Sequence, residues 1–239
     1  MFNAKEEVER IVGFIKEFFT ERPGFKGAVL GISGGKDSLV CAALCVKALG
    51  ANRVLGVLMP NGEQHDINDS WDTIKYLGIQ SFVANVGGMY REAVTAVGGH
   101  LMPITMQNIL PRLRMTALYA LAQERQFLVC TTANLSEITI GYTTKWGDSA
   151  GDFAPIAHLT KTEVVEVGVA LGLPLELVNK IPADGLSGMT DEDSFGFTYV
   201  ELDDYIRNAL DSVPLWAAAR IESRIAVNRH KRLPIPMVN

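Results

Sequence analysis

Apolar residues follow two different spacings along this chain. Between residues 5 and 19 they recur every three or four positions, which predicts a helix with one buried face, formed by Val8, Ile11, Val12, Ile15, Phe18 and Phe19. The run that follows, 27–32, is apolar throughout, bounded by glycine and too short for a helix. It predicts a buried strand.

The same alternation of strand and helix continues through the middle of the chain. We expect further strands at 53–59, 80–86 and 127–131, and helices at 38–49, about 66–77, about 88–97 and 112–125. Alternating strands and helices favour right-handed crossovers. The pattern therefore predicts an α/β fold with a doubly wound parallel β-sheet flanked by helices.

Two capping signals and a last apolar pattern predict the remaining helices. Thr160-x-x-Glu163 and Thr198-x-x-Glu201 are typical of capping boxes, and they open predicted helices at 161–171 and 199–211. A final helix is expected over 214–229. No internal repeat or long linker divides the chain, so we expect 1–239 to form a single domain.

Composition and charge narrow the class of protein. Of the 239 residues, 48% are hydrophobic, which excludes a disordered chain, and no uncharged apolar run is long enough to span a membrane. The charged N-terminus lacks the apolar core of a secretory signal. Three cysteines (Cys41, Cys45 and Cys130) are too few for a disulfide framework, which favours the cytoplasm. The net charge of −5 argues against a nucleic-acid partner.

The candidate chemistry is concentrated in a glycine-rich turn between the first strand and the second helix. The segment consists of Gly31, Ile32, Ser33, Gly34, Gly35, Lys36, Asp37 and Ser38. Successive backbone amides in such a turn, together with the positive end of a helix, form a cradle for an anion. The alternative is a tight connection in which the glycines supply only unusual dihedral angles.

Known phosphate and hydrolase motifs fit this turn less well. The dinucleotide fingerprint is absent, and the Walker A pattern fails because Asp37 follows Gly35-Lys36 where Ser or Thr is required. The turn does satisfy G-x-S-x-G, with Ser33 as the nucleophile of a hydrolase elbow and Asp203 and His230 as conceivable triad partners. A carboxylate at Asp37 would oppose a nearby oxyanion, whereas it suits a divalent cation between protein and phosphate oxygens.

The segment Ser33-Gly-Gly-x-Asp-Ser38 resembles the signature of the PP-loop ATP pyrophosphatases. Within that group the chain resembles NAD synthetase, through residues 108–119, 131–152, 155–161, 191–199 and 229–232. The resemblance implies an adenine-nucleotide alpha-hydrolase-like fold without a glutaminase domain. It also implies a homodimer that uses ATP, Mg²⁺ and ammonia to convert deamido-NAD to NAD through an adenylated intermediate, releasing AMP and pyrophosphate.

The resemblance also implies roles for individual residues. The loop 31–38 would bind the pyrophosphate end of ATP, and Asp37 and Lys161 would be catalytic. Further contacts to ATP would come from Thr132, Lys161 and position 183, and Asp37 and Glu137 would hold Mg²⁺. The deamido-NAD contacts would be Arg112, Lys145, Asp152, His230 and Lys231.

This sequence departs from the family pattern at a few positions. Ala183 stands where Ser or Thr usually touches ATP, so that contact is lost or comes from backbone. Thr131, Ala133 and Ser149 replace glycines, and Pro111 replaces an alanine. Because proline has no amide hydrogen, we expect the helix that carries Arg112 to begin at about Pro111.

Two other functions remain open at this stage. The chain could adenylate a different acceptor on the same fold. Alternatively, it could bind an adenine nucleotide without turnover, since the replacements near Thr132 and at Ala183 alter expected ATP contacts.

Overall fold

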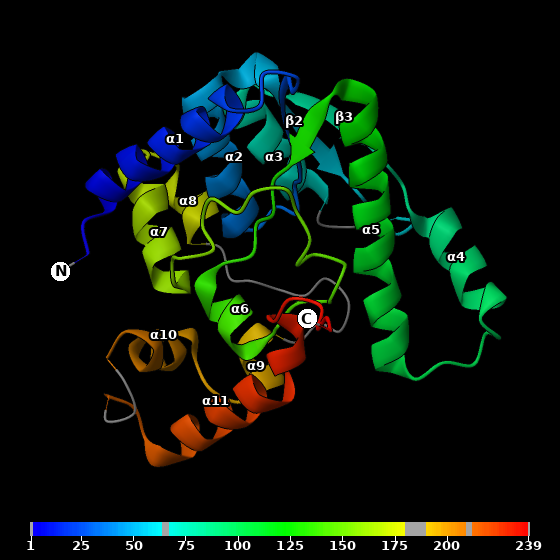
Figure 1. The fold of residues 1–239 in the computed structure, drawn as a ribbon, viewed down its shortest axis with the longest axis vertical. Coiled ribbons are helices and arrows are strands. Elements are labelled where there is room, and N and C mark those ends of the chain that lie inside the picture. Colours follow the sequence, from blue (N-terminus) through cyan, green and yellow to red (C-terminus); the bar gives the residue numbers. More distant parts are fainter. Residues whose placement is uncertain (1, 64–66, 180–189, 209–211, 239) are drawn as a thin grey trace.

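The fold is built on four parallel strands in the order β3-β2-β1-β4. The computed structural model describes residues 2–63, 67–179, 190–208 and 212–238 (Figure 1). The strands are β1 (Gly27–Gly31), β2 (Val54–Leu58), β3 (Gln80–Val83) and β4 (Phe127–Val129). In the centre of the sheet, Val29 of β1 pairs with Leu55 of β2 on one side and with Val129 of β4 on the other.

Helices cover both faces of this sheet. On β1, Ala28 and Leu30 point into a core shared with α1 (Ala4–Thr20), α2 (Lys36–Leu49) and α7 (Lys161–Ala170). Val29 points the opposite way, into a second core that includes Leu118 of α5 (Pro103–Arg125). Helix α3 (Ile67–Leu77) joins the first face, and α4 (Gly87–Ala96) packs against α5. The predicted doubly wound parallel sheet is confirmed.

A third core lies among the later helices, at the lower edge of Figure 1. Helices α6 (Leu135–Ile140), α9 (Asp191–Phe195), α10 (Tyr199–Asn208) and α11 (Leu215–Val227) contribute to it. Its buried residues are Ile140, Phe195, Phe197, Tyr199, Leu202, Ala217 and Ile221. Three short elements complete the described part: η1 (Ala51–Arg53), α8 (Leu175–Val178) and η3 (Arg229–Lys231).

The predicted capping boxes are confirmed. The Thr160 amide donates to the Glu163 carboxylate at 2.8 Å, and Thr160 Oγ1 accepts from the Glu163 amide. Thr198 and Glu201 exchange the same pair of bonds at 2.8 and 3.1 Å. Each box satisfies orphan amides at a helix start, which is why these two helices begin where the sequence places them.

The predicted start of a helix near Pro111 is wrong. Helix α5 runs without a break from Pro103 to Arg125, with Pro111 in its interior, and the proline of the first turn is Pro103. Packing explains why the helix continues, because Leu110 and Met115 on either side of the missing donor are buried in the core. Pro111 also packs closely against Gly147. A Cβ atom added to Gly147 would lie 2.9 Å from the Cβ of Pro111. Tertiary contacts outweigh the local preference.

None of the described helices is long and apolar enough to cross a membrane.

Gly27 of β1 lies close against the backbone of Arg53, the last residue of η1. A Cβ at this position would lie 2.2 Å from the carbonyl oxygen of Arg53, a backbone atom that cannot move aside cheaply. Gly27→Ala should therefore lower the free energy of unfolding by about 2 kcal/mol through overpacking. Gly13→Ala is the matched control, because its Cβ meets nothing within 4 Å on α1. It should raise stability by up to about 1 kcal/mol. Urea titration measures both, and equal effects would contradict the close approach.

Candidate active site

The order of the strands makes the boundary between β1 and β4 a topological switch point. The chain leaves β1 toward β2 on one side and later returns to place β4 on the other side. The connections that follow the two strands therefore diverge, and ligands of open α/β sheets bind at such a point, beyond the carboxyl ends of the strands. Residues 32–35 follow β1 and residues 130–134 follow β4, so both segments begin at this switch point.

The glycine-rich turn leads into α2 without a side-chain cap on the first amides of that helix. Gly34 has a φ of +80°, and a Cβ there would lie 2.7 Å from the Cβ of Asp69, so only glycine fits without strain. The turn is held by Ser38 Oγ, which donates to the Gly35 carbonyl at 2.9 Å and accepts from the Ser33 amide at 3.3 Å. Helix α2 then begins at Lys36, and its cap residue Gly35 has no side chain to occupy the first amides. This geometry fits a phosphate group.

A buried ion cluster lies beside the turn. Lys161 Nζ, from the first turn of α7, lies 2.6 Å from Oδ2 of Asp37 and 3.1 Å from Oε1 of Glu137. Lys161 is 5% exposed. The three side chains come from α7, α2 and α6, which are far apart in sequence. The structure thus brings together the three residues for which the resemblance implied catalysis or metal binding.

Asn134 holds two members of this cluster in place. Its Oδ1 accepts from the Glu137 amide at 3.0 Å and so caps α6, while its Nδ2 donates to Oδ1 of Asp37 at 3.1 Å. The Glu137 carboxylate accepts from the Asn134 amide in return, which completes a capping box. Sequence reasoning missed Asn134. The signal was present, because Asn134-Leu-Ser-Glu137 has the spacing of a capping box.

The cluster has unusual proton affinities. Burial raises the pKa of Glu137 to about 7; Lys161 works against this shift, and the charge of Asp37 adds to it. Burial alone would lower the pKa of Lys161, but the carboxylates of Asp37 and Glu137 outweigh it and raise the pKa above its ordinary value. Two acids therefore share one ammonium group, and the site can accept further positive charge when Glu137 is ionised.

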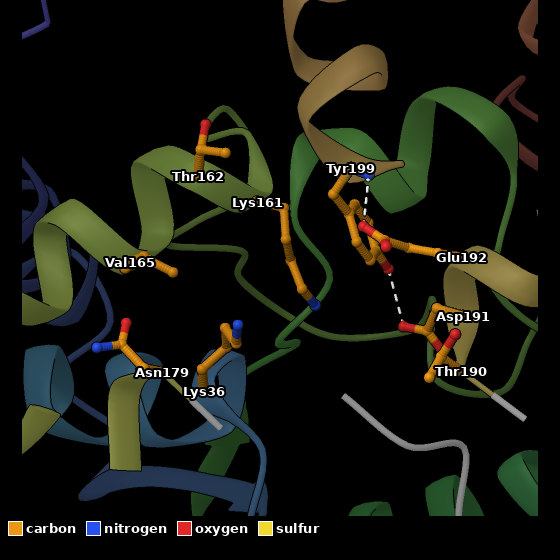
Figure 2. A pocket seen from close by; sticks show the side chains of 9 residues that line it. All are labelled: Lys36, Lys161, Thr162, Val165, Asn179, Thr190, Asp191, Glu192 and Tyr199. Carbon is orange, nitrogen blue, oxygen red and sulfur yellow. Dashed lines mark hydrogen bonds between the residues drawn. The ribbon is translucent and has the colours of Figure 1, made fainter. Parts of the chain in front are cut away.

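A cavity of about 330 Å³ adjoins the cluster. It is lined by Lys36, Lys161, Thr162, Val165, Asn179, Thr190, Asp191, Glu192 and Tyr199 (Figure 2). Figure 2 shows Lys161 reaching from α7 toward Tyr199, and Nζ lies 4.9 Å from the centre of the tyrosine ring. The Tyr199 hydroxyl donates to Asp191 at 2.9 Å, and its amide donates to Glu192 at 2.8 Å. Burial lowers the pKa of Lys36, the second cation of the cavity.

Four of the predicted deamido-NAD contacts form a second, basic group. Arg112 Nε donates to the carbonyl of Lys145 at 3.1 Å, and Lys145 Nζ donates to the carbonyl of His230 at 2.9 Å. Lys231 Nζ donates to the carbonyl of Gly141 at 2.7 Å. Burial lowers the pKa of Lys231, and the neighbouring Arg112 adds to this effect. Helix α5, the loop after α6 and η3 therefore meet in one positively charged region.

The other predicted residues have different surroundings. Asp152 lies along β4, where its carboxylate accepts from the Val129 amide at 2.7 Å and from the Tyr119 hydroxyl at 3.4 Å. Thr132 is half-buried in the segment that follows β4. Ala183 lies outside the described residues.

Two of the residues that depart from the family pattern hold the loop after α6 in place through their hydroxyls. Thr131 Oγ1 donates to the Asp148 carbonyl at 3.2 Å, and Ser149 Oγ donates to the Thr144 carbonyl at 2.9 Å.

The hydrolase alternative finds no support in these contacts. Asp203 is buried, and its carboxylate accepts from the Ser136 hydroxyl and from the Thr162 amide. The Ser33 hydroxyl lies 3.3 Å from Ser38 Oγ within the turn itself. The acid of the conceivable triad is thus engaged elsewhere.

The strand order, the glycine turn at the divergence of β1 and β4, and the buried acid–lysine cluster define an α/β nucleotide-binding enzyme with a phosphate loop. Comparison with known proteins agrees. The family model described as NAD synthase matches residues 7–234, and the chain belongs to this family. It is accordingly a carbon–nitrogen ligase of NAD biosynthesis with ATP as a substrate.

Three similar proteins are synthetases of NAD or NMN. The NH(3)-dependent NAD(+) synthetase of Thermococcus sibiricus is 39% identical, over 95% of each chain. The structure of NMN synthetase from Francisella tularensis superposes with a TM-score of 0.92 at 33% identity, over 100% of each chain. NAD+ synthetase from Burkholderia pseudomallei gives a TM-score of 0.79 at 29% identity, covering 98% of this chain and 92% of that one.

Removing the lysine tests the ion cluster. Lys161→Met leaves two buried carboxylates facing each other, so the free energy of unfolding should fall by about 3 kcal/mol. The fall should be larger at pH 8.5 than at pH 6. Without Lys161 the folded-state pKa of Glu137 rises further above its ordinary value of 4.5. An acid whose pKa is raised by folding destabilises the folded protein more and more as the pH rises from its ordinary pKa to its folded-state pKa.

The matched control is Lys47→Met. Lys47 Nζ lies 3.4 Å from Glu9 Oε1 in an ion pair whose side chains are 46% and 70% exposed, so its loss should cost less than about 1 kcal/mol at either pH. Urea titrations at both pH values give the comparison. A pH-independent cost at Lys161, or one no larger than at Lys47, would show that the cluster is not coupled as described.

Proposed function

We propose that this chain amidates deamido-NAD with ammonia, using ATP to form an adenylated intermediate and releasing AMP and pyrophosphate. The observation that carries the proposal is the Asp37–Lys161–Glu137 cluster at the mouth of the phosphate loop. It occurs in a chain that matches the NAD synthase family over residues 7–234. The structural contacts and the family membership support the same reaction.

The chemistry explains why cations and amides dominate the site. A carboxylate is a poor electrophile, and adenylation gives it a good leaving group. Activation brings an anionic acceptor next to the more highly charged ATP, so the protein must offset negative charge. In our proposal the amides of the turn 31–38 bind the pyrophosphate end of ATP, and Lys161 and Thr132 contact the nucleotide. Catalysis then rests on positioning and electrostatics, without an enzyme nucleophile.

Asp37 and Glu137 would hold Mg²⁺. Within the described residues no group of three or more His, Cys, Asp or Glu side chains could bind a metal ion by itself. Two carboxylates are nevertheless the protein ligands that Mg²⁺ takes when substrate phosphates supply the rest. The oxygen donors of Asp37 and Glu137 therefore fit this cation. When bound, it would neutralise charge on the phosphates.

The basic group would bind the acceptor. Arg112, Lys145, His230 and Lys231 lie together, and the arginine and the two lysines bring positive charge, which suits the phosphates of deamido-NAD. Asp152 would contact the same substrate. We further propose a single domain that forms a homodimer in the cytoplasm, with no nucleic-acid or membrane partner.

A second candidate acceptor is the smaller mononucleotide, deamido-NMN. The similarity to the NMN synthetase of Francisella tularensis, with a TM-score of 0.92, favours it. Both acceptors present the same nicotinate carboxylate, so the adenylation chemistry is unchanged. The two candidates differ in whether the site uses the second nucleotide of deamido-NAD.

Steady-state assays with both acceptors and an Asp37 variant test the proposal. The wild type should show the higher kcat/KM with deamido-NAD and should release AMP only when acceptor and ammonium are present. Asp37→Asn should lower kcat at least about 100-fold, because it removes the charge that would hold Mg²⁺. Asp204→Asn, an exposed change of the same chemistry, should leave turnover unchanged.

The alternatives give different results in this assay. A higher kcat/KM with deamido-NMN would make deamido-NMN the preferred acceptor and leave the proposed mechanism unchanged. No AMP with either acceptor, although ATP binds, would reject the ligase function in favour of a nucleotide-binding protein.

A further inference from the structure

Asp203 is a buried acid that forms no ion pair with a cation of the described residues. It lies on α10, is 5% exposed, and is absent from the salt bridges of the described residues. Its Oδ1 accepts from the Ser136 hydroxyl at 2.5 Å, and its Oδ2 accepts from the Thr162 amide at 2.8 Å. Burying an unpaired carboxylate is unfavourable for stability. Stability alone therefore does not explain why an acid occupies this position.

Both partners of Asp203 are next to members of the ion cluster. Ser136 directly precedes Glu137 on α6, and Thr162 directly follows Lys161 on α7. The Ser136 hydroxyl also accepts from the Lys161 amide at 2.9 Å, so the serine bridges the starts of the two helices. A single carboxylate thus fixes α6 and α7 relative to each other within one residue of both charged side chains.

The charge of Asp203 also suits its location. Lys161 places a cation at the first residue of α7, where the positive end of the helix dipole opposes it. The carboxylate of Asp203 accepts from the next amide of that same turn. Its negative charge offsets the unfavourable position of the lysine, and its two acceptors fix the direction in which the lysine leaves the helix.

We propose that Asp203 is a positioning residue, which sets Lys161 against Asp37 and Glu137 through Ser136 and the start of α7. The proposal rests on the function assigned above to that cluster. Asp203 acts through Lys161 and does not itself touch the substrates. Its loss should therefore affect steps that need Lys161 more than it affects binding of the acceptor at the basic group.

Asp203→Asn is the informative variant, with Asp204→Asn as its matched control. Asparagine keeps one acceptor and replaces the other with a donor, so the Thr162 amide and the Ser136 hydroxyl can no longer both donate to the side chain. We expect kcat to fall about 10- to 100-fold. The KM for ATP should rise while the KM for deamido-NAD stays unchanged. Asp204 is the adjacent, exposed acid, and its replacement should change neither constant.

A double-mutant cycle separates positioning from a general structural role. In the Lys161→Met background, the additional change Asp203→Asn should alter kcat less than twofold, because the side chain that it positions is already gone. A full loss in both backgrounds, or equal rises in both KM values, would overturn the proposal. So would wild-type kcat in Asp203→Asn itself.

ATP binding measured by calorimetry keeps the two proposals distinguishable. A wild type that forms no amide with either acceptor would count against the proposed function only. In that case Asp203→Asn should still weaken ATP binding several-fold relative to Asp204→Asn, since Lys161 contacts the nucleotide in our proposal. Equal ATP affinities of the two variants would overturn the role of Asp203.

Discussion

The buried contact of Lys161 with Asp37 and Glu137 is the interaction on which this site depends. Each charge is unfavourable in the interior without its partners, so the three side chains are stable only as a group. They come from α7, α2 and α6. The group forms only when the sheet, the phosphate turn and the later helices are all in place. The same contact therefore stabilises the fold and forms the site.

The fold supplies this contact through the position of β4 beside β1. The turn that begins α2 follows β1, and the segment that begins α6 follows β4, so the divergence of the two strands places Asp37 near Glu137. Asn134 then joins these two residues directly, by capping α6 and donating to Asp37. Helix α7 adds the lysine. The polar residues around the cluster thus do two things at once: they terminate helices and they orient charged groups.

The sequence predicts the regular part of this architecture well and the polar connections poorly. Strands such as Gly27–Gly31 were predictable because a short apolar run between glycines has few alternatives. The start of α7 was predictable because a capping box is local. The start of α5 was not, since tertiary burial of Leu110 and Met115 carries the helix through Pro111. Helices as short as α6 and α9 show too few turns for periodicity to reveal them.

The site shows the same division. The turn 31–38 is visible from its glycines alone, and a resemblance to a family suggested Glu137 and Lys161. The residues that join them were not visible in that way. Asn134 reaches Asp37 across 97 residues of sequence, and Asp203 reaches Ser136 across 67. Asp203 looked like a conceivable triad acid until the fold placed it, on α10, in contact with the start of α7. Buried polar partners depend on tertiary geometry, which no local pattern encodes.

The central claim is that a carboxylate is adenylated at this cluster, and an isotope experiment tests it most directly. In the proposed reaction one carboxylate oxygen of deamido-NAD attacks the α-phosphorus of ATP and displaces pyrophosphate. Ammonia then attacks the acyl carbon, and AMP leaves with that oxygen. Deamido-NAD labelled with oxygen-18 in the nicotinate carboxylate should therefore yield AMP carrying one labelled oxygen and unlabelled pyrophosphate. Unlabelled AMP, or label in orthophosphate accompanied by ADP, would contradict the account.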